Sequence, residues 1–245
     1  MDNIWQETFS VGFRDIDPSD RLTLGAIFDY FQEASINHAE NLGVGRASMA
    51  QTGQIWILSR ISVVLERRPR YRETITLRSW PRGTEKLFAI RDYDIQDASA
   101  TPLVRGRSAW LILDMEKHRP LRPQAVVDKL PLNQGLDALH QGVPGLTTRV
   151  LTKVGERRAA YSDIDYNRHV NNARYIQWIQ DIIDPELLEH ASHMRLDVNY
   201  LQEIKGGETT ELWSAPLDDS GFAFEGRRHD TGQAVFRAEL GIHAS

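Results

Sequence analysis

Residues 13–33 read FRDIDPSDRLTLGAIFDYFQE, and residues 161–181 read YSDIDYNRHVNNARYIQWIQD. The two stretches align without a gap and share Asp-Ile-Asp, a late Gln and hydrophobic residues at matching places. The repeat continues in segments 60–81 and 195–216, which agree at seven positions where chance would give roughly one or two. Because this period is far longer than that of a solenoid repeat, the sequence predicts two domain-sized copies of one unit.

The two copies differ in a group of polar residues. The second copy alone carries Asn167, His169, Asn171 and Asn172, in place of Ser19, Arg21, Thr23 and Leu24 of the first. Glu203 of the second copy likewise aligns with Arg68 of the first. A titratable cluster that only one copy has predicts a repeated scaffold with a single working site, in the C-terminal half.

Each copy has the pattern of a strand, one main helix and several further strands. Apolar residues recur at helical spacing from about residue 24 to 42 and from about 172 to 183. Alternation at Phe9, Val11 and Phe13 predicts the strand before the first helix. The other strands are expected near 54–66, 72–80, 86–96, 103–115, 154–162, 194–203, 208–215, 220–228 and 233–243, with a hairpin turn at Asp230-Thr231-Gly232. One helix against an antiparallel sheet, twice, is an α+β arrangement in which a sheet wraps around a long helix.

The segment between the copies has the composition of a linker. Residues 117–150 contain four prolines and three glycines, which predicts a connection that crosses the surface. We therefore expect an N-terminal domain at 1–125, a linker at 126–148 and a C-terminal domain at 149–245.

Composition excludes several classes of function. The net charge of −5 argues against a general nucleic-acid binder, which is usually basic. The absence of cysteine excludes disulfides, thiolate metal sites and a cysteine nucleophile. The first ten residues, MDNIWQETFS, lack the pattern of a secretion signal, and no stretch predicts a membrane span, so we expect a cytosolic protein.

Motifs for other chemistries are absent or incomplete. The sequence has no glycine-rich phosphate loop, no G-x-S-x-G elbow and no dinucleotide fingerprint, which disfavours a serine hydrolase or a nucleotide-dependent enzyme. Glu189, His190 and His193 form an E-H-x-x-H string, but its spacing differs from that of a helical zinc site, and it is expected in a loop before a strand. We therefore expect no metal and no cofactor.

The polar string of the second copy has the residue types that thioester hydrolysis needs. His169 is the natural base near neutral pH, Asn167 offers an amide donor to a carbonyl oxygen, and Asp165 could orient either one. The string also precedes a helix, whose first N–H groups are free and favour negative charge. The same residues are equally compatible with a polar turn that ends in an asparagine helix cap.

The stretch from Asp165 to Asn172, with Tyr175 and Trp178 after it, resembles the signature of acyl-ACP thioesterases of the bacterial type. Trp56 to Arg60, Arg107 to Trp110 and Arg119 to Pro123 are similar to that family's first half. The resemblance implies a tandem, or double, hot-dog fold and an enzyme that releases fatty acids from acyl carrier protein without a cofactor. A tandem pair already has two hot-dog units, so we expect a monomer or a homodimer.

The resemblance also implies roles for individual residues. It assigns catalysis to Asp165, Asn167, His169 and Glu203, and it leaves open whether Glu203 activates water or attacks the thioester directly. Some members of the family have a cysteine after that glutamate, but Ile204 stands here, so a cysteine-dependent mechanism is impossible.

The resemblance further implies that the N-terminal half, with a degenerate site, binds the acyl chain. Candidates for contact with the substrate are Phe28, Phe31, Trp56, Trp110, Asn171 and Asn172, although core packing explains any one of the aromatic residues equally well.

A local concentration of arginine, including Arg67, Arg68 and Arg70, permits two interpretations. It guards a strand edge, or it docks the acidic acyl carrier protein through complementary charge. Two alternatives to the main hypothesis remain: an acyl-CoA thioesterase, whose phosphates the arginines would bind, and a non-catalytic acyl-binding module.

Overall fold

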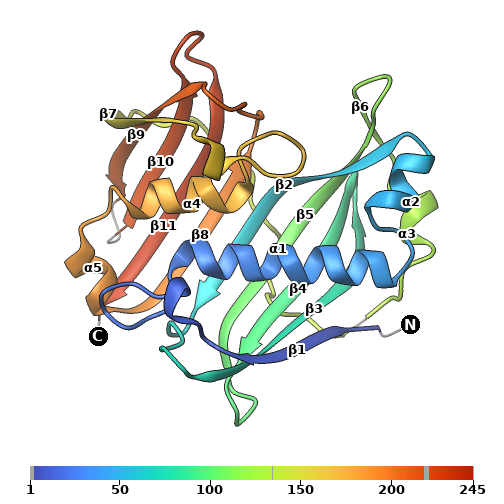
Figure 1. Cartoon of the computed structure of the whole chain (residues 1–245), viewed down its shortest axis with the longest axis horizontal. Helices are drawn as coiled ribbons and strands as arrows, with labels where there is room; N and C mark the ends of the chain where they lie inside the picture. The colour runs from blue at the N-terminus through green and yellow to red at the C-terminus, as the bar shows by residue number, and fades with distance from the viewer. Residues whose placement is uncertain (1–2, 134, 218–220, 245) are drawn as a thin grey trace.

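Both halves of the chain build one continuous antiparallel sheet (Figure 1). The computed structural model describes residues 3–133, 135–217 and 221–244. The strands of the first half are β1 (Trp5–Ser10), β2 (Gln54–Leu65), β3 (Thr74–Glu85), β4 (Phe88–Gln96), β5 (Pro102–Asp114) and the short β6 (Arg119–Leu121). Those of the second half are β7 (Thr152–Arg158), β8 (Ala191–Tyr200), β9 (Thr209–Leu217), β10 (Gly221–Arg228) and β11 (Ala234–Ala244).

The order of the strands has the symmetry expected of a duplication. It runs β1-β3-β4-β5-β2-β8-β11-β10-β9-β7, with β6 paired to β5 beside this path. The two halves join where β2 pairs with β8, in a register that sets Ser62 opposite Asp197. These two residues are each other's counterparts in the repeat, so a pseudo-twofold axis passes between them.

Two helices pack side by side on one face of the sheet: α1 (Leu24–Asn41) and α4 (Asn172–Gln180) (Figure 1). Thr23 caps α1, because its hydroxyl accepts a hydrogen bond from the Ala26 N–H at 3.1 Å. Gly25 allows the close approach of the two helices, since a Cβ there would lie 2.5 Å from Cγ of Gln177. The predicted main helices are thus confirmed, and they bring the two halves into direct contact.

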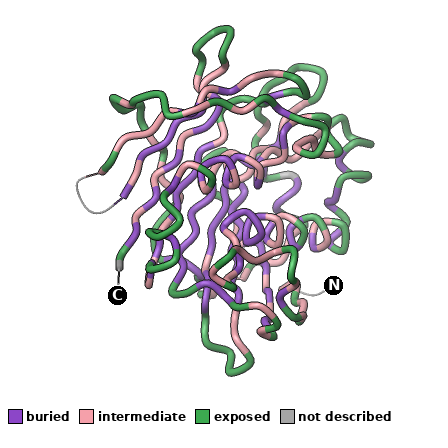
Figure 2. Tube along the Cα trace, turned by 60° about the vertical axis from the view of Figure 1, so that its left-hand side comes forward, coloured by how far each residue is buried: buried purple, intermediate pink, exposed green. Residues whose placement is uncertain are grey.

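A hydrophobic core between helices and sheet spans both halves. Ile27 and Phe31 of α1 pack with Val63 of β2, while Ile176 of α4 packs with Val198 of β8, all within one buried cluster. Buried positions follow the central strands and the inner sides of the helices in Figure 2, and the connecting loops are mostly exposed. The expected α+β architecture of a sheet around a long helix is confirmed.

Several short elements differ from the prediction. Phe13 does not continue the first strand: it lies in a 3₁₀ turn, η1 (Phe13–Asp15), with 76% of its surface exposed. Tyr161 lies in the matching turn η2 (Tyr161–Asp163), so the strand predicted at 154–162 ends earlier. The helices α2 (Arg46–Gln51), α3 (Gln124–Val127) and α5 (Pro185–His190) have too few residues to produce a helical period in the sequence. The hairpin between β10 and β11 is confirmed.

The segment between the halves lies on the sheet face opposite the helices. Tyr93 stacks on Phe31 of α1, so its neighbour Asp92 points to the other face. There the Asp92 carboxylate accepts a hydrogen bond from the Ala138 N–H at 2.9 Å, and Asn199 accepts one from the Leu146 N–H at 2.7 Å. The segment is therefore bonded to both halves of the sheet. No described helix is long and apolar enough to cross a membrane.

Candidate active site

The loop that carries His169 is shaped by Asp165. One carboxylate oxygen of Asp165 accepts from the Asn167 N–H at 2.8 Å, and the Asp165 N–H donates to the His169 carbonyl at 2.8 Å. Arg168 takes a left-handed conformation with φ of 66°, which is uncommon for a residue with a side chain. Asp165 thus folds the loop through backbone contacts, and this turn sets the direction of the imidazole.

The first half builds the same loop from different residues. Asp17 accepts from the Ser19 N–H at 2.9 Å, its own N–H donates to the Arg21 carbonyl at 2.9 Å, and Asp20 has φ of 62°. These contacts form an Asx turn in the first copy. The backbone of the loop is therefore common to both halves, while the polar side chains on it belong to the second half alone.

His169 and Glu203 are brought together from separate parts of the chain. Nε2 of His169 lies 3.3 Å from Oε2 of Glu203, and their side chains are 25% and 55% exposed. Glu203 follows the end of β8, and the adjacent Ile204 carbonyl accepts from the Val170 N–H at 2.8 Å, which ties that strand end to the loop. The contact gives the site a base and a carboxylate within proton-transfer reach.

The start of α4 completes the polar surface. Asn171 is the helix cap, because its side-chain oxygen accepts from the Ala173 N–H at 2.9 Å. Asn167 is exposed, and its side chain makes no hydrogen bond with any residue in the described part of the chain. Its amide is therefore available to an incoming group, whereas Asn171 is already used for the helix. The cap predicted as an alternative exists together with the candidate site.

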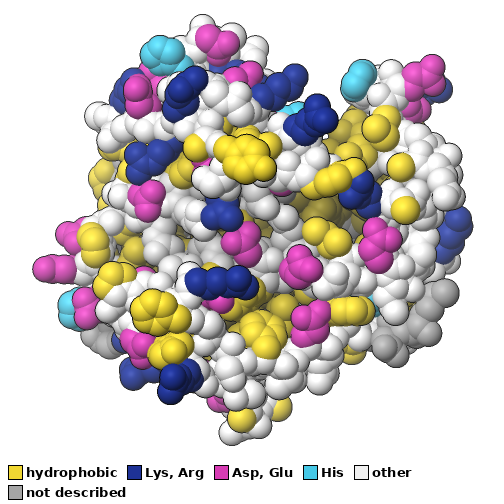
Figure 3. All heavy atoms as spheres, viewed as in Figure 1, with side chains coloured by type: hydrophobic (Ala, Val, Ile, Leu, Met, Phe, Trp, Pro, Cys, Tyr) yellow, Lys and Arg dark blue, Asp and Glu magenta, His cyan; other side chains and the backbone are white. Residues whose placement is uncertain are grey.

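An apolar pocket lies beside this polar surface and between the two halves. Its unfilled space is about 260 Å³ including open solvent, but only about 10 Å³ of this admits the centre of a water-sized sphere. α1, β2, β4 and β5 form most of its wall, and the first turn of α4 closes it; the lining residues are Phe28, Phe31, Gln32, Leu58, Ile61, Tyr93, Trp110, Asn172 and Ala173. Figure 3 shows hydrophobic side chains gathered in a hollow of this face, between α1 and the loop that leads into α4. Asn172, at the wall of the pocket, therefore follows His169 by only three residues in the chain.

Four of the six predicted contact residues line this pocket, while Trp56 and Asn171 do not. Phe28, Phe31, Trp110 and Asn172 are at its wall. Trp56 points elsewhere: its indole N–H donates to the Val44 carbonyl at 2.9 Å, and the ring packs in a second hydrophobic cluster under α2. The prediction that Trp56 lines the pocket is wrong: Trp56 lies on the same face of β2 as Leu58, but two residues nearer the strand end that α2 covers.

The arginine segment does not form a uniform basic surface. Arg68 is buried, with 2% of its side chain exposed, and forms an ion pair with Asp17. Its guanidinium also donates to the Leu188 carbonyl of α5 at 2.9 Å. Arg67 pairs with Glu73 at 2.5 Å, and Arg70 is exposed. Docking through Arg68 is therefore excluded by its burial, and the segment adjoins the first loop, not the loop of His169.

A contact between the halves lies over the second loop. The guanidinium of Arg46, at the start of α2, is 3.1 Å from the ring centre of Tyr166. Tyr166 stands between Asp165 and Asn167, so a cation–π contact from the first half bears on the loop of the second half that carries His169. The sequence does not predict this pair, because neither residue belongs to the pattern of similar residues that the two halves share.

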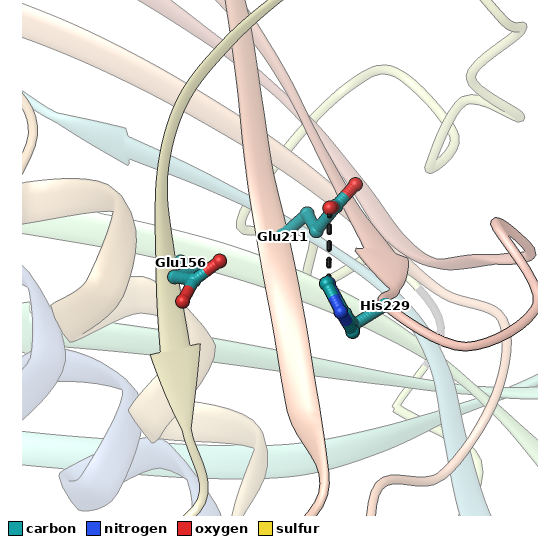
Figure 4. Close-up of side chains that lie close together, drawn as sticks. All are labelled: Glu156, Glu211 and His229. Atoms are coloured by element: carbon teal, nitrogen blue, oxygen red, sulfur yellow. Dashed lines mark hydrogen bonds and ion pairs between the residues drawn. The ribbon is translucent and has the colours of Figure 1, made fainter.

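Two groups of carboxylates and imidazoles lie away from this site. In Figure 4, Glu156, Glu211 and His229 face one another at the far end of the second half of the sheet. Nζ of Lys153 lies 2.7 Å from Glu211 and 3.3 Å from Glu156, so an ammonium already balances these carboxylates.

The E-H-x-x-H string was expected in a loop, but the structure places it at the end of α5 and the start of β8. Glu189 and His190 end α5, and His193 belongs to β8. Nδ1 of His190 lies 2.8 Å from the Glu186 carbonyl, and Nδ1 of His193 lies 3.2 Å from the Glu66 carboxylate. The two imidazoles are thus engaged with different partners.

Comparison with known proteins gives a consistent family. Residues 2–129 match the model of the acyl-ACP thioesterase N-terminal domain, and residues 152–239 match that of the acyl-ACP thioesterase C-terminal domain. A chloroplastic acyl-[acyl-carrier-protein] hydrolase of Cuphea viscosissima is 25% identical over 244 residues, which cover 89% of this chain and 56% of that protein. A chloroplastic palmitoyl-acyl carrier protein thioesterase of Arabidopsis thaliana is 23% identical and is covered to 52%. The chain thus spans a little over half the length of these curated relatives.

Solved structures share the fold over the full chain. An acyl-ACP thioesterase from Bacteroides thetaiotaomicron superposes with a TM-score of 0.83 at 23% identity, with 98% of each chain covered. The 12:0-ACP thioesterase from Umbellularia californica superposes with a TM-score of 0.86 at 19% identity and covers 100% of this chain and 99% of that one. These superpositions confirm the expected double hot-dog fold.

Proposed function

Because the chain belongs to the acyl-ACP thioesterase family, we propose that it hydrolyses fatty acyl-ACP to a free fatty acid and acyl carrier protein. The observation that carries this proposal is the 3.3 Å contact between Nε2 of His169 and Glu203, placed beside an apolar pocket. Hydrolysis of a fatty acyl thioester needs a base at the carbonyl and an apolar slot for the chain. This site offers both within one junction between the two halves.

In the proposed reaction, water attacks the thioester carbonyl carbon. The His169–Glu203 pair takes the water proton, and a carbon–oxygen bond forms to give a tetrahedral intermediate. The carbon–sulfur bond then breaks, and the thiolate of the carrier's prosthetic group leaves with the proton from the pair. In the alternative route, the Glu203 carboxylate attacks the carbonyl carbon, and the carbon–sulfur bond breaks to release the thiolate. Water then hydrolyses the resulting anhydride.

The oxyanion of the intermediate needs hydrogen-bond donors. The exposed amide of Asn167 makes no hydrogen bond with the described residues, so it is available to that oxygen. The positive end of the α4 dipole favours negative charge at the same place. Asp165 is assigned the role of holding the loop, since its carboxylate accepts from the Asn167 N–H. Removal of a preorganised donor of this kind typically lowers kcat by a factor of about 10²–10³.

The acyl chain is assigned to the apolar pocket. Phe28, Phe31 and Trp110 of the first half form its wall, while Asn172 and Ala173 of the second half close it. This supports a division of labour in which the N-terminal domain, 1–125, binds the chain and the C-terminal domain, 149–245, supplies the chemistry. A cytosolic location is part of the same proposal; the plant relatives are named as chloroplastic proteins.

The test compares two substrates and two proteins. Steady-state hydrolysis of acyl-ACP and acyl-CoA is measured with the wild type and with His169→Ala. Turnover of acyl-ACP that is lost in the variant supports the proposal. A preference for acyl-CoA supports a CoA thioesterase instead, and saturable binding without turnover of either substrate supports an acyl-binding module. Arg174→Ala is a useful control for folding, because it alters the same helix outside the His169–Glu203 pair.

A further inference from the structure

Tyr175 is a buried phenol that the mechanism above does not use. It lies in the first turns of α4 with 2% of its surface exposed. Its ring packs against Trp178 at 5.2 Å and against Phe236 at 5.2 Å, measured between ring centres. Yet its hydroxyl makes no complete hydrogen bond with the described residues. A buried hydroxyl without a hydrogen-bond partner lowers the stability of the fold, so its presence calls for a functional reason.

The groups around that hydroxyl include residues of the proposed catalytic site. The backbone N–H of Ile204 faces the phenol oxygen, and the charged groups that act on the phenol are Arg228, Glu203 and Asp165. Burial raises the pKa of Tyr175, so the phenol stays protonated at neutral pH. Among the described residues, the Ile204 N–H donates no hydrogen bond to a backbone or side-chain acceptor. Two unsatisfied polar groups thus face each other behind Glu203.

The first half has neither of these polar groups. In the alignment of the two copies, Tyr175 corresponds to Ile27, and Ile204 corresponds to Pro69. Isoleucine has no hydroxyl, and proline has no backbone N–H. The backbone around them is otherwise the same, since the Pro69 carbonyl accepts from Leu22 at 2.7 Å just as the Ile204 carbonyl accepts from Val170 at 2.8 Å. The donor and the acceptor therefore occur together in the half that has the imidazole and are both absent from the other.

We propose that Tyr175 is a positioning residue, whose hydroxyl accepts a hydrogen bond from the Ile204 N–H and thereby holds Glu203 against His169. Ile204 is the residue through which the end of β8 is bonded to the catalytic loop, so a restraint on its N–H fixes the carboxylate that precedes it. The phenol touches neither the substrate nor the reacting atoms. This assignment rests on the proposed function for its catalytic consequence, but not for the hydrogen bond itself.

The hydrogen bond is tested without any turnover measurement. Amide hydrogen exchange of Ile204 is followed by NMR in the full-length wild type and in Tyr175→Phe, which keeps the aromatic packing. We expect slow exchange in the wild type and exchange faster by about tenfold in the variant, as for the loss of one hydrogen bond. An Ile204 amide that exchanges freely in the wild type, or equally in both proteins, overturns the proposal. This result stands whether or not the protein hydrolyses acyl-ACP.

The positioning role is tested by separating kcat from KM. Tyr175→Phe is expected to lower kcat by about tenfold and to leave KM for acyl-ACP unchanged, since the pocket is intact. Tyr30→Phe is the matched control, because the Tyr30 hydroxyl donates to Asp15 at 2.9 Å, far from the loop of His169, and its kcat should not change. A purely structural phenol predicts the opposite: unchanged kcat and equal or higher stability on removal of an unsatisfied hydroxyl. That outcome overturns the role.

Discussion

Arg68 occupies in the first half the position that Glu203 occupies in the second, and it forms a buried ion pair with Asp17. The second half instead sets the exposed carboxylate of Glu203 3.3 Å from the imidazole of His169. The same loop and strand end thus serve two purposes. In one half they present titratable groups to solvent, and in the other they close on a guanidinium that also bonds to the carbonyl of Leu188.

Replacing Arg68 should therefore destabilise the fold and leave the chemistry intact. Arg68→Met removes one partner of a buried pair and leaves the Asp17 carboxylate uncompensated, which typically costs about 3–5 kcal/mol. Denaturant unfolding measures this loss, and kcat of the folded variant at low temperature should equal that of the wild type. Arg67→Met is the control, because the Arg67–Glu73 pair is partly exposed and should contribute less than about 1 kcal/mol. Equal effects of the two replacements would contradict the assignment.

The same ion pair predicts a dependence of stability on acid. Burial opposes ionisation of Asp17, but the hydrogen bonds from Ser19 and Arg68 and the charge of Arg68 prevail and hold its pKa below the ordinary 3.8. A carboxyl with a lowered pKa in the folded state stabilises the protein above its unfolded value, and this contribution is lost as the pH falls through the folded value. The difference in unfolding free energy between wild type and Asp17→Asn should thus shrink below about pH 4. A difference in unfolding free energy that stays constant from about pH 3 to 7 would refute this prediction.

Replacement of the candidate carboxylate should remove turnover. Glu203→Gln keeps the size of the side chain and removes its basicity. We therefore expect kcat to fall by a factor of about 10²–10⁴, while the free energy of unfolding stays unchanged. Single turnover in H₂¹⁸O, followed by mass spectrometry of the peptide that contains Glu203, tests for the anhydride route. Label in Glu203 indicates direct attack, because water enters that carboxylate only through an anhydride. A variant with near-wild-type kcat would show that Glu203 is not the catalytic carboxylate.

Activity should rise with pH through the range in which histidine titrates. A base must be unprotonated to accept a proton, and imidazole ordinarily loses its proton near pH 6.5. We therefore expect kcat/KM on acyl-ACP to increase from about pH 5 to 8 and then to level off. His169→Ala should lose both the activity and this ascending limb. A flat profile in the wild type over that range would contradict the assignment of His169 as base.

The depth of the acyl pocket should respond to Gly106 in β5. A Cβ at this position would lie 2.6 Å from Cε2 of Phe31, whose ring is stacked on Tyr93 at 4.5 Å and cannot retreat. Gly106→Ala should push the Phe31 ring into the pocket at a cost of about 1–3 kcal/mol in stability. With a series of acyl-ACPs, the preference should move towards shorter chains. Gly155→Ala, where a Cβ meets nothing within 4 Å, is the control. An unchanged preference would place the acyl chain elsewhere.

Features that depend on repetition could be read from the sequence. The two main helices, the strands that pair in the sheet and the shared Asx turn all follow from local patterns that occur twice. His169 and Glu203 could be selected because each differs from its counterpart in the other copy. Their 3.3 Å contact could not be derived from spacing, since it depends on how the end of β8 meets the loop.

Contacts between segments that are separated in the chain could not be derived from the sequence. Arg68 was grouped with its exposed neighbours, because a run of arginines is usually solvated and its buried partner Asp17 lies 51 residues away. Trp56 is aromatic and lies on the same strand face as Leu58, so only its position along β2 places it under α2 and outside the pocket. The stacking of Arg46 on Tyr166 joins segments that share no pattern.

The hydrogen-bonded junction of β2 with β8 places two related units in one polypeptide. In an assembly of two identical subunits, each amino-acid replacement appears in both, so neither copy can diverge alone. A fused gene product escapes that constraint. In this chain, one unit has a buried ion pair at the position where the other unit has an exposed carboxylate beside an imidazole.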